Sequence, residues 1–166
     1  IIDGLHLNVN LDHEFQTIEE NFVAGLGREY AASRGEYLNG ILMANYLGIP
    51  FIDAAEVVFF DEHGNFLSEE TNEELSERLA HVERAVIPGF YGSGRDGKIH
   101  TFSRGGSDIT GSIVARAIHA DLYENWTDVS GILMADPRIG PDPLPIERIT
   151  YNELRELSFV GAQVLH

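Results

Sequence analysis

The chain has 166 residues, and its 27 acidic side chains outnumber 11 basic ones, which gives a formal charge of -16 at pH 7. This length suits one domain with a sizeable hydrophobic core. The acidic balance argues against binding to nucleic acid or to an anionic membrane, since both attract a basic surface. Without cysteine the chain has no disulfides and no thiolate chemistry. No apolar run approaches the roughly 18 residues that span a bilayer, and no signal segment opens the chain, so a cytoplasmic protein is the default expectation.

Helical spacing dominates the first part of the chain. Residues 1–12 show no periodicity and are expected to form a loop. Apolar residues recur at helical spacing over 13–33, a stretch that Gly25 and Gly27 can divide in two. The sequence therefore predicts one interrupted helix or two consecutive helices here.

A further helix is predicted from about Glu36 to Leu47. Gly48 and Pro50 follow it in the usual order of termination signals. Thr71 and Glu74 have the spacing of a capping box, which predicts the start of an acidic helix. Apolar stretches predict short strands at 51–60, 84–90 and 98–102, with a turn at 61–65 and a glycine-rich loop at 91–97.

The rest of the chain alternates in the same way. A helix is predicted over about 109–119, strands over 122–128 and 131–136, and a proline-rich loop over 137–149. Thr150 and Glu153 form a second capping box that opens a final helix. Strands alternating with helices are typical of an α/β sandwich with a largely parallel sheet.

The stretch "SRGGSD" at 103–108 directly precedes a predicted helix. Its glycines can let backbone N–H groups face a ligand at the helix N-terminus, and Arg104 can bind a carboxylate or phosphate with two parallel hydrogen bonds. Ser107 and Asp108 can cap the helix or hold polar groups of a substrate. A tight turn with a helix cap, without any ligand, explains the same residues.

The stretch "WTDVSGILMADPR" is the second candidate. Thr127 and Asp128 end a predicted strand before a glycine turn, and open α/β sheets bind ligands beyond such strand ends. Arg138 follows a proline and can reach a phosphate. Ordinary turn chemistry remains an alternative for this stretch, as a favourable helix-dipole interaction does for Glu36 in "RGEYLNG".

Signatures of several other chemistries are missing. The sequence contains no "GxxxxGK[ST]" phosphate loop and no dinucleotide-binding glycine pattern. Its seven histidines form no metal-ligand pair, so no metal site is expected.

Taken together, "FSRGGSDITGSIVARAIHADLYENWTDVSGILMADPRI", "RITYNELRELSFVGAQVLH", "PGFYGS" and "RGEYLNG" resemble the aspartokinases of the amino acid kinase family. The resemblance covers nearly the whole chain, and the pairing of "RGGSD" with "WTDVSG…DPR" is its specific part. It implies a three-layer α/β/α sandwich with a largely parallel sheet, in incomplete form, over residues 1–166. It also implies transfer of the ATP γ-phosphoryl group to the side-chain carboxylate of L-aspartate, the first step toward lysine, threonine and methionine.

The resemblance assigns roles to particular residues. Arg104 and Asp108 would be catalytic, and Arg104 would clamp a carboxylate of aspartate. Aspartate would be bound by Glu36, Arg104, Gly105, Gly106, Ser107 and Asp108. ATP, with Mg²⁺, would be bound by Thr127, Asp128, Leu133 and Arg138. No nucleic acid or membrane partner is implied, and a homo-oligomer is expected.

The sequence departs from the family pattern at three places. The family's "K-F-G-G" phosphate motif is missing, and the one lysine, Lys98, lies elsewhere. Gln163 stands where the family often has lysine, and Leu133 where it often has tyrosine. No C-terminal ACT domains are present. We therefore expect a central catalytic-domain fragment that is inactive or nearly so alone and that dimerises or exchanges strands.

Two alternatives stay open at this point. One is a non-catalytic module that binds a small amino acid or nucleotide through the same loops. The other is an amino acid kinase with a different acceptor.

Overall fold

The computed structural model describes residues 1–103, 105–126, 131–134 and 142–159. The chain divides into two compact units, Ile1–Tyr123 and Glu124–His166, which are taken separately below. None of the helices in these described stretches is long and apolar enough to cross a membrane.

The first unit begins with three helices. They are α1 (Ile2–Leu5), α2 (Asp12–Val23) and α3 (Gly27–Leu47). Gly25 and Gly27 adopt positive φ angles of 75° and 90°, so the predicted division of the helical stretch is confirmed. Gly48 ends α3 in the left-handed conformation with a φ of 66°, also as predicted. α3 is longer than the sequence indicated, and the short α1 was missed.

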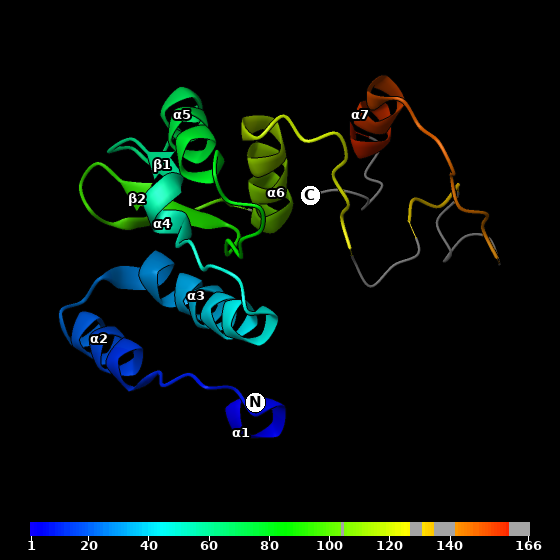
Figure 1. Ribbon diagram of the computed structural model, residues 1–166. Coiled ribbons are helices and arrows are strands. Elements are labelled where there is room, and N and C mark those ends of the chain that lie inside the picture. Colours follow the sequence, from blue (N-terminus) through cyan, green and yellow to red (C-terminus); the bar gives the residue numbers. More distant parts are fainter. Residues whose placement is uncertain (104, 127–130, 135–141, 160–166) are drawn as a thin grey trace. The chain divides into compact units, whose positions relative to one another are not determined.

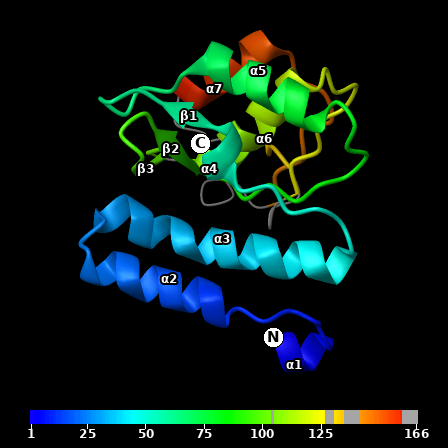
Figure 2. The same ribbon diagram turned by 60° about the vertical axis from the view of Figure 1, so that its left-hand side comes forward.

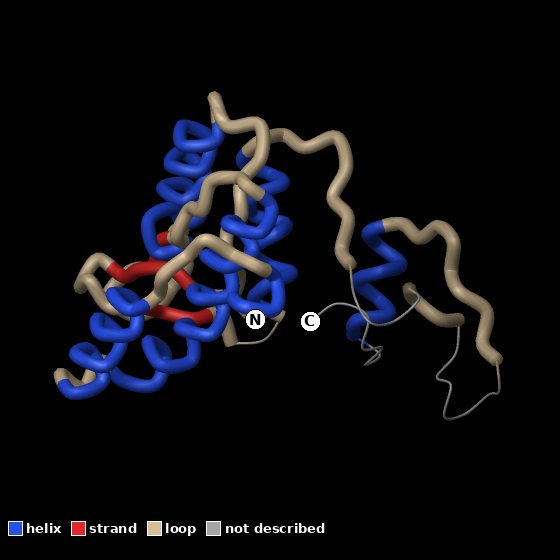
Figure 3. Tube along the Cα trace, turned by 60° about the horizontal axis from the view of Figure 1, so that its bottom comes forward, coloured by secondary structure: helices blue, strands red, loops and turns tan. Residues whose placement is uncertain are grey.

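A small sheet follows. It contains β1 (Phe59–Phe60), β2 (Tyr91–Gly94) and β3 (Ile99–Thr101) in that order, with β1 parallel and β3 antiparallel to β2. Figure 3 shows these short strands enclosed by longer helices. Among the described residues of 84–90, the predicted strand is reduced to one parallel bridge between Val86 and Phe51.

Among the described residues, four further helices follow. The first unit contains α4 (Ala54–Val57), α5 (Ser68–Leu79) and α6 (Gly106–Ala117), and the second contains α7 (Tyr151–Phe159). α3 and α5 lie on opposite sides of the sheet, and α2 lies beside α3 on the outer side (Figures 1 and 2). The first unit thus has helices on both faces of its sheet, as in a layered α/β domain.

The hydrophobic core lies on the side of the sheet covered by α5 and α6. Its buried members are Ile52, Val57, Val58, Phe60, Leu75 and Ala117, with Phe66 and Phe102 among the partly buried side chains packed on them. The rings of Phe60 and Phe102 lie 5.0 Å apart, which brings the end of β3 onto this core. Phe102 therefore anchors the segment that leads from β3 into α6 to the hydrophobic core.

Two local predictions are wrong. Thr71 does not cap a helix: it lies inside α5, fully buried, and its Oγ1 accepts a hydrogen bond from the Phe59 amide at 3.0 Å. The short strand predicted within 51–60 is confirmed as β1, although the helical turn α4, capped by Asp53, precedes it. The glycine-rich stretch 91–97 contains β2 where a loop was expected.

In the second unit, the described residues 124–126 form no strand, and Leu133 makes one antiparallel bridge with Pro145. The predicted strands over 122–128 and 131–136 are not present in the described parts of these ranges. The second capping box is confirmed: Glu153 Oε2 accepts from the Thr150 amide at 2.8 Å, and the Glu153 amide donates to Thr150 Oγ1.

Candidate functional site

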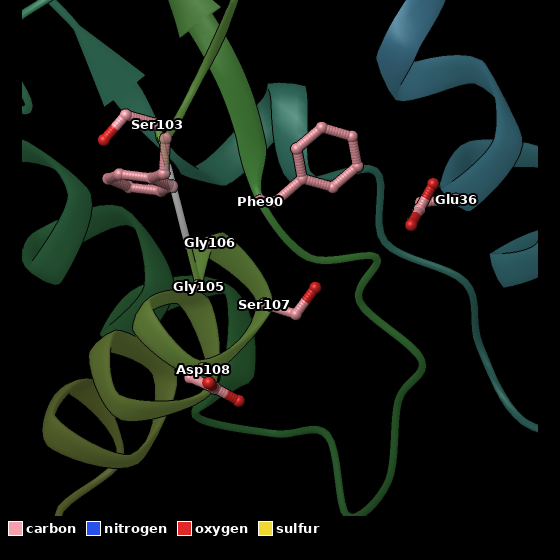
Figure 4. A pocket seen from close by; sticks show the side chains of 8 residues that line it. Glu36, Phe90, Ser103, Gly105, Gly106, Ser107 and Asp108 are labelled. Atoms are coloured by element: carbon pink, nitrogen blue, oxygen red, sulfur yellow. The ribbon is translucent and has the colours of Figure 1, made fainter. Parts of the chain in front are cut away.

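One pocket of the first unit gathers most of the residues predicted to bind an acceptor substrate. Its volume is about 370 Å³, and it is open to solvent because Glu36, Ser103 and Ser107 are exposed. We call it the acceptor pocket, and it is lined by Glu36, Phe90, Phe102, Ser103, Gly105, Gly106, Ser107 and Asp108. In Figure 4, Glu36 projects from α3 across from Ser107 on α6, and the Phe90 ring lies beside the space between them.

The first turn of α6 forms one wall of the acceptor pocket. Gly105 precedes the helix in the left-handed conformation with a φ of 57°, and a glycine adopts this conformation without strain. Ser107 and Asp108 lie within the first turn, and α6 has no side-chain cap, so the capping interpretation of these residues is wrong. The amide N–H groups of a first turn have no partner within the helix, and they carry partial positive charge.

Phe90 and Phe102 form a second wall of the acceptor pocket, and Gly106 allows them to lie close to α6. A Cβ built at Gly106 would lie 2.7 Å from Phe90 Cα and 3.0 Å from Phe102 Cβ, so no larger residue fits. Phe90 itself has a φ of 64°, a left-handed conformation that strains a bulky residue. Two hydrogen bonds hold it there: its amide donates to Thr110 Oγ1 at 3.0 Å, and its carbonyl accepts from the Phe102 amide at 2.9 Å.

α3 forms the opposite wall of the acceptor pocket through Glu36, and side-chain packing holds α3 against β2. The guanidinium of Arg34 is buried, and its carbon lies 4.6 Å from the ring centroids of both Tyr30 and Tyr37 and 5.4 Å from that of Tyr91. Tyr91 donates a hydrogen bond to Asp53 Oδ1 at 2.7 Å, and its burial beside this carboxylate raises the pKa of its hydroxyl. This packing fixes the turn of α3 that precedes Glu36.

Tyr123 lies behind the first wall. Its hydroxyl packs directly against Gly111 of α6, and burial together with the negative charge of Asp108 raises the pKa of that hydroxyl. Tyr123 therefore lies near Asp108, although it does not line the acceptor pocket.

The predicted site residues have different outcomes. Glu36, Gly105, Gly106, Ser107 and Asp108 all line the acceptor pocket. Arg104, Thr127, Asp128 and Arg138 lie outside the described residues. Leu133 is half-buried in the second unit, where it pairs with Pro145.

Sequence reasoning did not nominate Phe90, Phe102, Ser103 or Tyr123. Phe90 and Ser103 stand inside the quoted "PGFYGS" and "FSRGGSD" stretches, so their proximity to the glycines was an available signal. No pattern in the sequence singled out Tyr123.

The acceptor pocket is chemically suited to a small molecule with charges of both signs. The carboxylates of Glu36 and Asp108 can face an ammonium group, while the first-turn amides of α6 can face a carboxylate. A free amino acid carries both groups. Within the described stretches, no cluster of three His, Asp or Glu side chains could hold a metal ion.

Comparison with known sequences gives consistent similarities. Residues 2–166 match the model of the amino acid kinase family. The chain is 51% identical over 81 residues to aspartokinase 3 of Bacillus subtilis, covering 49% of this chain and 18% of the relative. It is 35% identical over 146 residues to the aspartokinase of Rickettsia conorii, covering 83% of this chain and 36% of the relative.

Solved structures agree with these sequences. The aspartate kinase of Clostridium acetobutylicum superposes with a TM-score of 0.93 at 53% identity, covering 100% of this chain and 38% of that one. Aspartokinase III of E. coli in complex with aspartate and ADP gives a TM-score of 0.79 at 26% identity, covering 97% of this chain and 41% of that one. The predicted α/β fold class is thereby confirmed. The chain spans well under half the length of each of these four relatives.

Proposed function

Because this chain belongs to the amino acid kinase family, we propose that it is part of an aspartokinase. The whole protein transfers the ATP γ-phosphoryl group to the side-chain carboxylate of L-aspartate and yields 4-phospho-L-aspartate. The pathway would be the synthesis of lysine, threonine and methionine. The observation that carries the proposal is the convergence of Glu36, Ser107 and Asp108 on one pocket from two helices, α3 and α6, that are far apart in sequence.

The chemistry suits these residue types. The aspartate side chain is ionised at neutral pH and is already a nucleophile, so the site needs no general base. Its task is to hold two anions in line while charge spreads over the transferred phosphoryl oxygens. The described residues of the pocket supply orientation: Glu36 and Asp108 for the substrate ammonium, and the α6 amides with Ser107 for a carboxylate.

The remaining roles are part of the proposal. Arg104 would clamp a substrate carboxylate, and Thr127, Asp128, Leu133 and Arg138 would bind ATP. The relative that was solved with aspartate and ADP supports this pair of ligands. Mg²⁺ would accompany ATP and neutralise phosphate charge.

Steady-state kinetics of the full-length protein test the proposal, with ADP release measured against aspartate, ATP and Mg²⁺. Asp108→Asn keeps the shape of the side chain and removes the charge, so we expect kcat/KM for aspartate to fall about a hundredfold or more. The KM for ATP should change less than about threefold, because Asp108 would not contact the nucleotide.

Two serines of α6 provide a matched control. Ser107→Ala removes a hydroxyl of the acceptor pocket and should raise the KM for aspartate. Ser112 is exposed outside this pocket and donates to the Ile109 carbonyl, so Ser112→Ala should leave that KM unchanged. No aspartate-dependent ADP release by the wild-type protein would refute the proposal. Aspartate binding in calorimetry without turnover would indicate a binding module, and turnover with another acceptor would indicate a different kinase of the family.

A polypeptide of only these 166 residues should show little or no turnover. The reason is that its sequence has no counterpart of the family's lysine-containing phosphate motif. Clear turnover by that polypeptide would contradict this part of the proposal.

A further inference from the structure

The acceptor pocket is assembled from two segments that are distant in sequence. α3 supplies Glu36, and the segment running from β3 into α6 supplies Ser103 and the residues 105–108. The pocket keeps its shape only while these two segments hold a fixed separation. A direct bond between them would set that separation.

Glu29 makes such a bond. It lies in the first turn of α3, and its Oε1 accepts a hydrogen bond from the Thr101 amide at 2.9 Å and another from Thr101 Oγ1 at 3.0 Å. Glu29 and Glu36 are seven residues apart on the same helix, so both project from the same face of α3. Glu29 bonds to Thr101 at the end of β3, and Glu36 lines the acceptor pocket, whose lining begins with the next residue, Phe102.

The geometry of the sheet explains why the Thr101 amide can donate a hydrogen bond to Glu29. In the antiparallel pair of β2 and β3, the Phe102 amide donates to the Phe90 carbonyl, so the preceding amide of Thr101 points away from β2. An outward N–H of this kind lies at an open sheet edge, where no strand accepts its hydrogen bond. The Glu29 carboxylate accepts the hydrogen bond of the Thr101 amide instead.

The same carboxylate faces the neighbouring residue of β3. Glu29 Oε2 lies 3.5 Å from His100 Nδ1, and Asp96 Oδ1 lies 3.6 Å from His100 Nε2 on the other side of the ring. The His100 ring also packs against Phe60 of the core in a tilted arrangement, with 5.8 Å between centroids and 39° between the ring planes. Glu29 thus contacts two consecutive residues of the strand that leads into the pocket.

We propose that Glu29 is a positioning residue for the acceptor pocket: it fixes the distance between α3 and the β3–α6 segment without touching the substrate. The expected effect on the KM for aspartate rests on the proposed function. The expected effect on the separation of α3 and β3 rests on the structure alone. We expect the bond between Glu29 and Thr101 to affect aspartate binding in the acceptor pocket and not to affect nucleotide binding.

A purely stabilising role makes a different prediction. Glu29 in the first turn of α3 also interacts favourably with the helix dipole, and losing that charge would lower the amount of folded protein. Less folded protein lowers the apparent kcat and leaves KM unchanged. Glu29→Gln separates the two roles, since glutamine loses the charge but keeps an oxygen that can accept both Thr101 hydrogen bonds.

The test compares three variants in the full-length protein: Glu29→Ala, Glu29→Gln and, as the matched control, Glu19→Ala, which removes an exposed carboxylate from α2. We expect Glu29→Ala to raise the KM for aspartate about tenfold with less than a twofold change in the KM for ATP. Glu29→Gln should restore the KM to within about threefold of wild type, and Glu19→Ala should leave it unchanged. An unchanged KM for aspartate in Glu29→Ala, with an active wild type, would overturn the proposal.

Amide hydrogen exchange tests the same bond without any assay of turnover. Exchange at the Thr101 amide, which donates to Glu29, and at the neighbouring Phe102 amide, which donates to the Phe90 carbonyl, should speed up at least about tenfold in Glu29→Ala, and not in Glu19→Ala. This result would support the positioning role even if the wild-type protein released no ADP with aspartate, in which case only the proposed function fails. Equal exchange in all variants would refute the positioning role whatever the kinetics show.

Discussion

At the scale of single residues, charge pairs on the surface set individual pKa values. Asp96 lies in the turn between β2 and β3, where Oδ2 is 2.9 Å from Lys98 Nζ and Oδ1 accepts from the Lys98 amide at 3.1 Å. The hydrogen bonds from the Lys98 side chain and amide lower the pKa of Asp96 from 3.8 to about 2.

This shift has a definite sign. A carboxyl group whose pKa is lower in the folded state contributes stability above its unfolded pKa, and that contribution disappears as the pH falls from about 4 through 2. We expect a carbon-detected NMR titration to give Asp96 a pKa of about 2. In Lys98→Ala the pKa should rise toward 3.8 without reaching it, because the backbone amide still donates.

Asp61 is the internal control for that titration. Its pKa is lowered by hydrogen bonds from Asn65 and His63, none of which involves Lys98. A low Asp61 pKa should therefore persist in Lys98→Ala. An Asp96 pKa that ignores the substitution would contradict the assignment.

At the scale of elements, Gly35 and Gly40 lie within α3 in opposite surroundings. Nothing lies within 4 Å of a Cβ built at the exposed Gly35, whereas a Cβ at the buried Gly40 would lie 2.8 Å from Phe51 Cε2. Phe51 cannot simply swing away, since its ring packs against Tyr37 with 5.7 Å between centroids.

The pair gives a matched prediction for helix stability. Gly35→Ala should stabilise the protein by about 0.5–1 kcal/mol, because alanine loses less backbone entropy in a helix. Gly40→Ala should destabilise it by about 1–3 kcal/mol, because the added methyl overpacks the contact with Phe51. Urea denaturation of both variants measures the difference, and effects of equal sign would show that α3 does not pack on Phe51 as described.

The same scale shows what sequence can and cannot predict. The break at Gly25 and Gly27, the stop at Gly48 and the cap at Thr150 depend on local conformation, and each was predictable. β2 was missed because its glycines suggest a loop. They stand in a strand because the Val58 carbonyl approaches Gly92 too closely for any Cβ, which is a tertiary contact.

The prediction that Thr71 caps a helix is wrong for a related reason. Its spacing to Glu74 satisfies the capping pattern, but burial against β1 gives its hydroxyl another partner, the Phe59 amide. In the site, Glu36, Ser107 and Asp108 could be nominated from motifs, whereas the contributions of Glu29 and Tyr123 depend on contacts between segments far apart in sequence.

At the scale of the whole molecule, the chain divides at Tyr123 and Glu124 into two compact units. Large apolar side chains next to this division are exposed: Leu122 retains 73% of its accessible surface and Trp126 retains 88%. Chymotrypsin cleaves after such residues, whereas Phe60 and Tyr91 in the sheet are buried.

We therefore expect limited chymotrypsin digestion to cut at Leu122 or Trp126 well before it cuts within β1 or β2. Mass spectrometry of the early fragments identifies the sites. Addition of 4 M urea serves as the control, because unfolding should abolish the preference. Early cleavage at Phe60 in native buffer would contradict the division into compact units.

The left-handed conformation of Phe90 has a consequence for attempts to engineer this protein. Glycine or asparagine at position 90 would relieve the strained backbone, and selection for thermal tolerance alone should favour them. The same change deletes the aromatic ring that lines the acceptor pocket. Position 90 is thus a point where gains in heat resistance and retention of substrate selectivity pull in opposite directions.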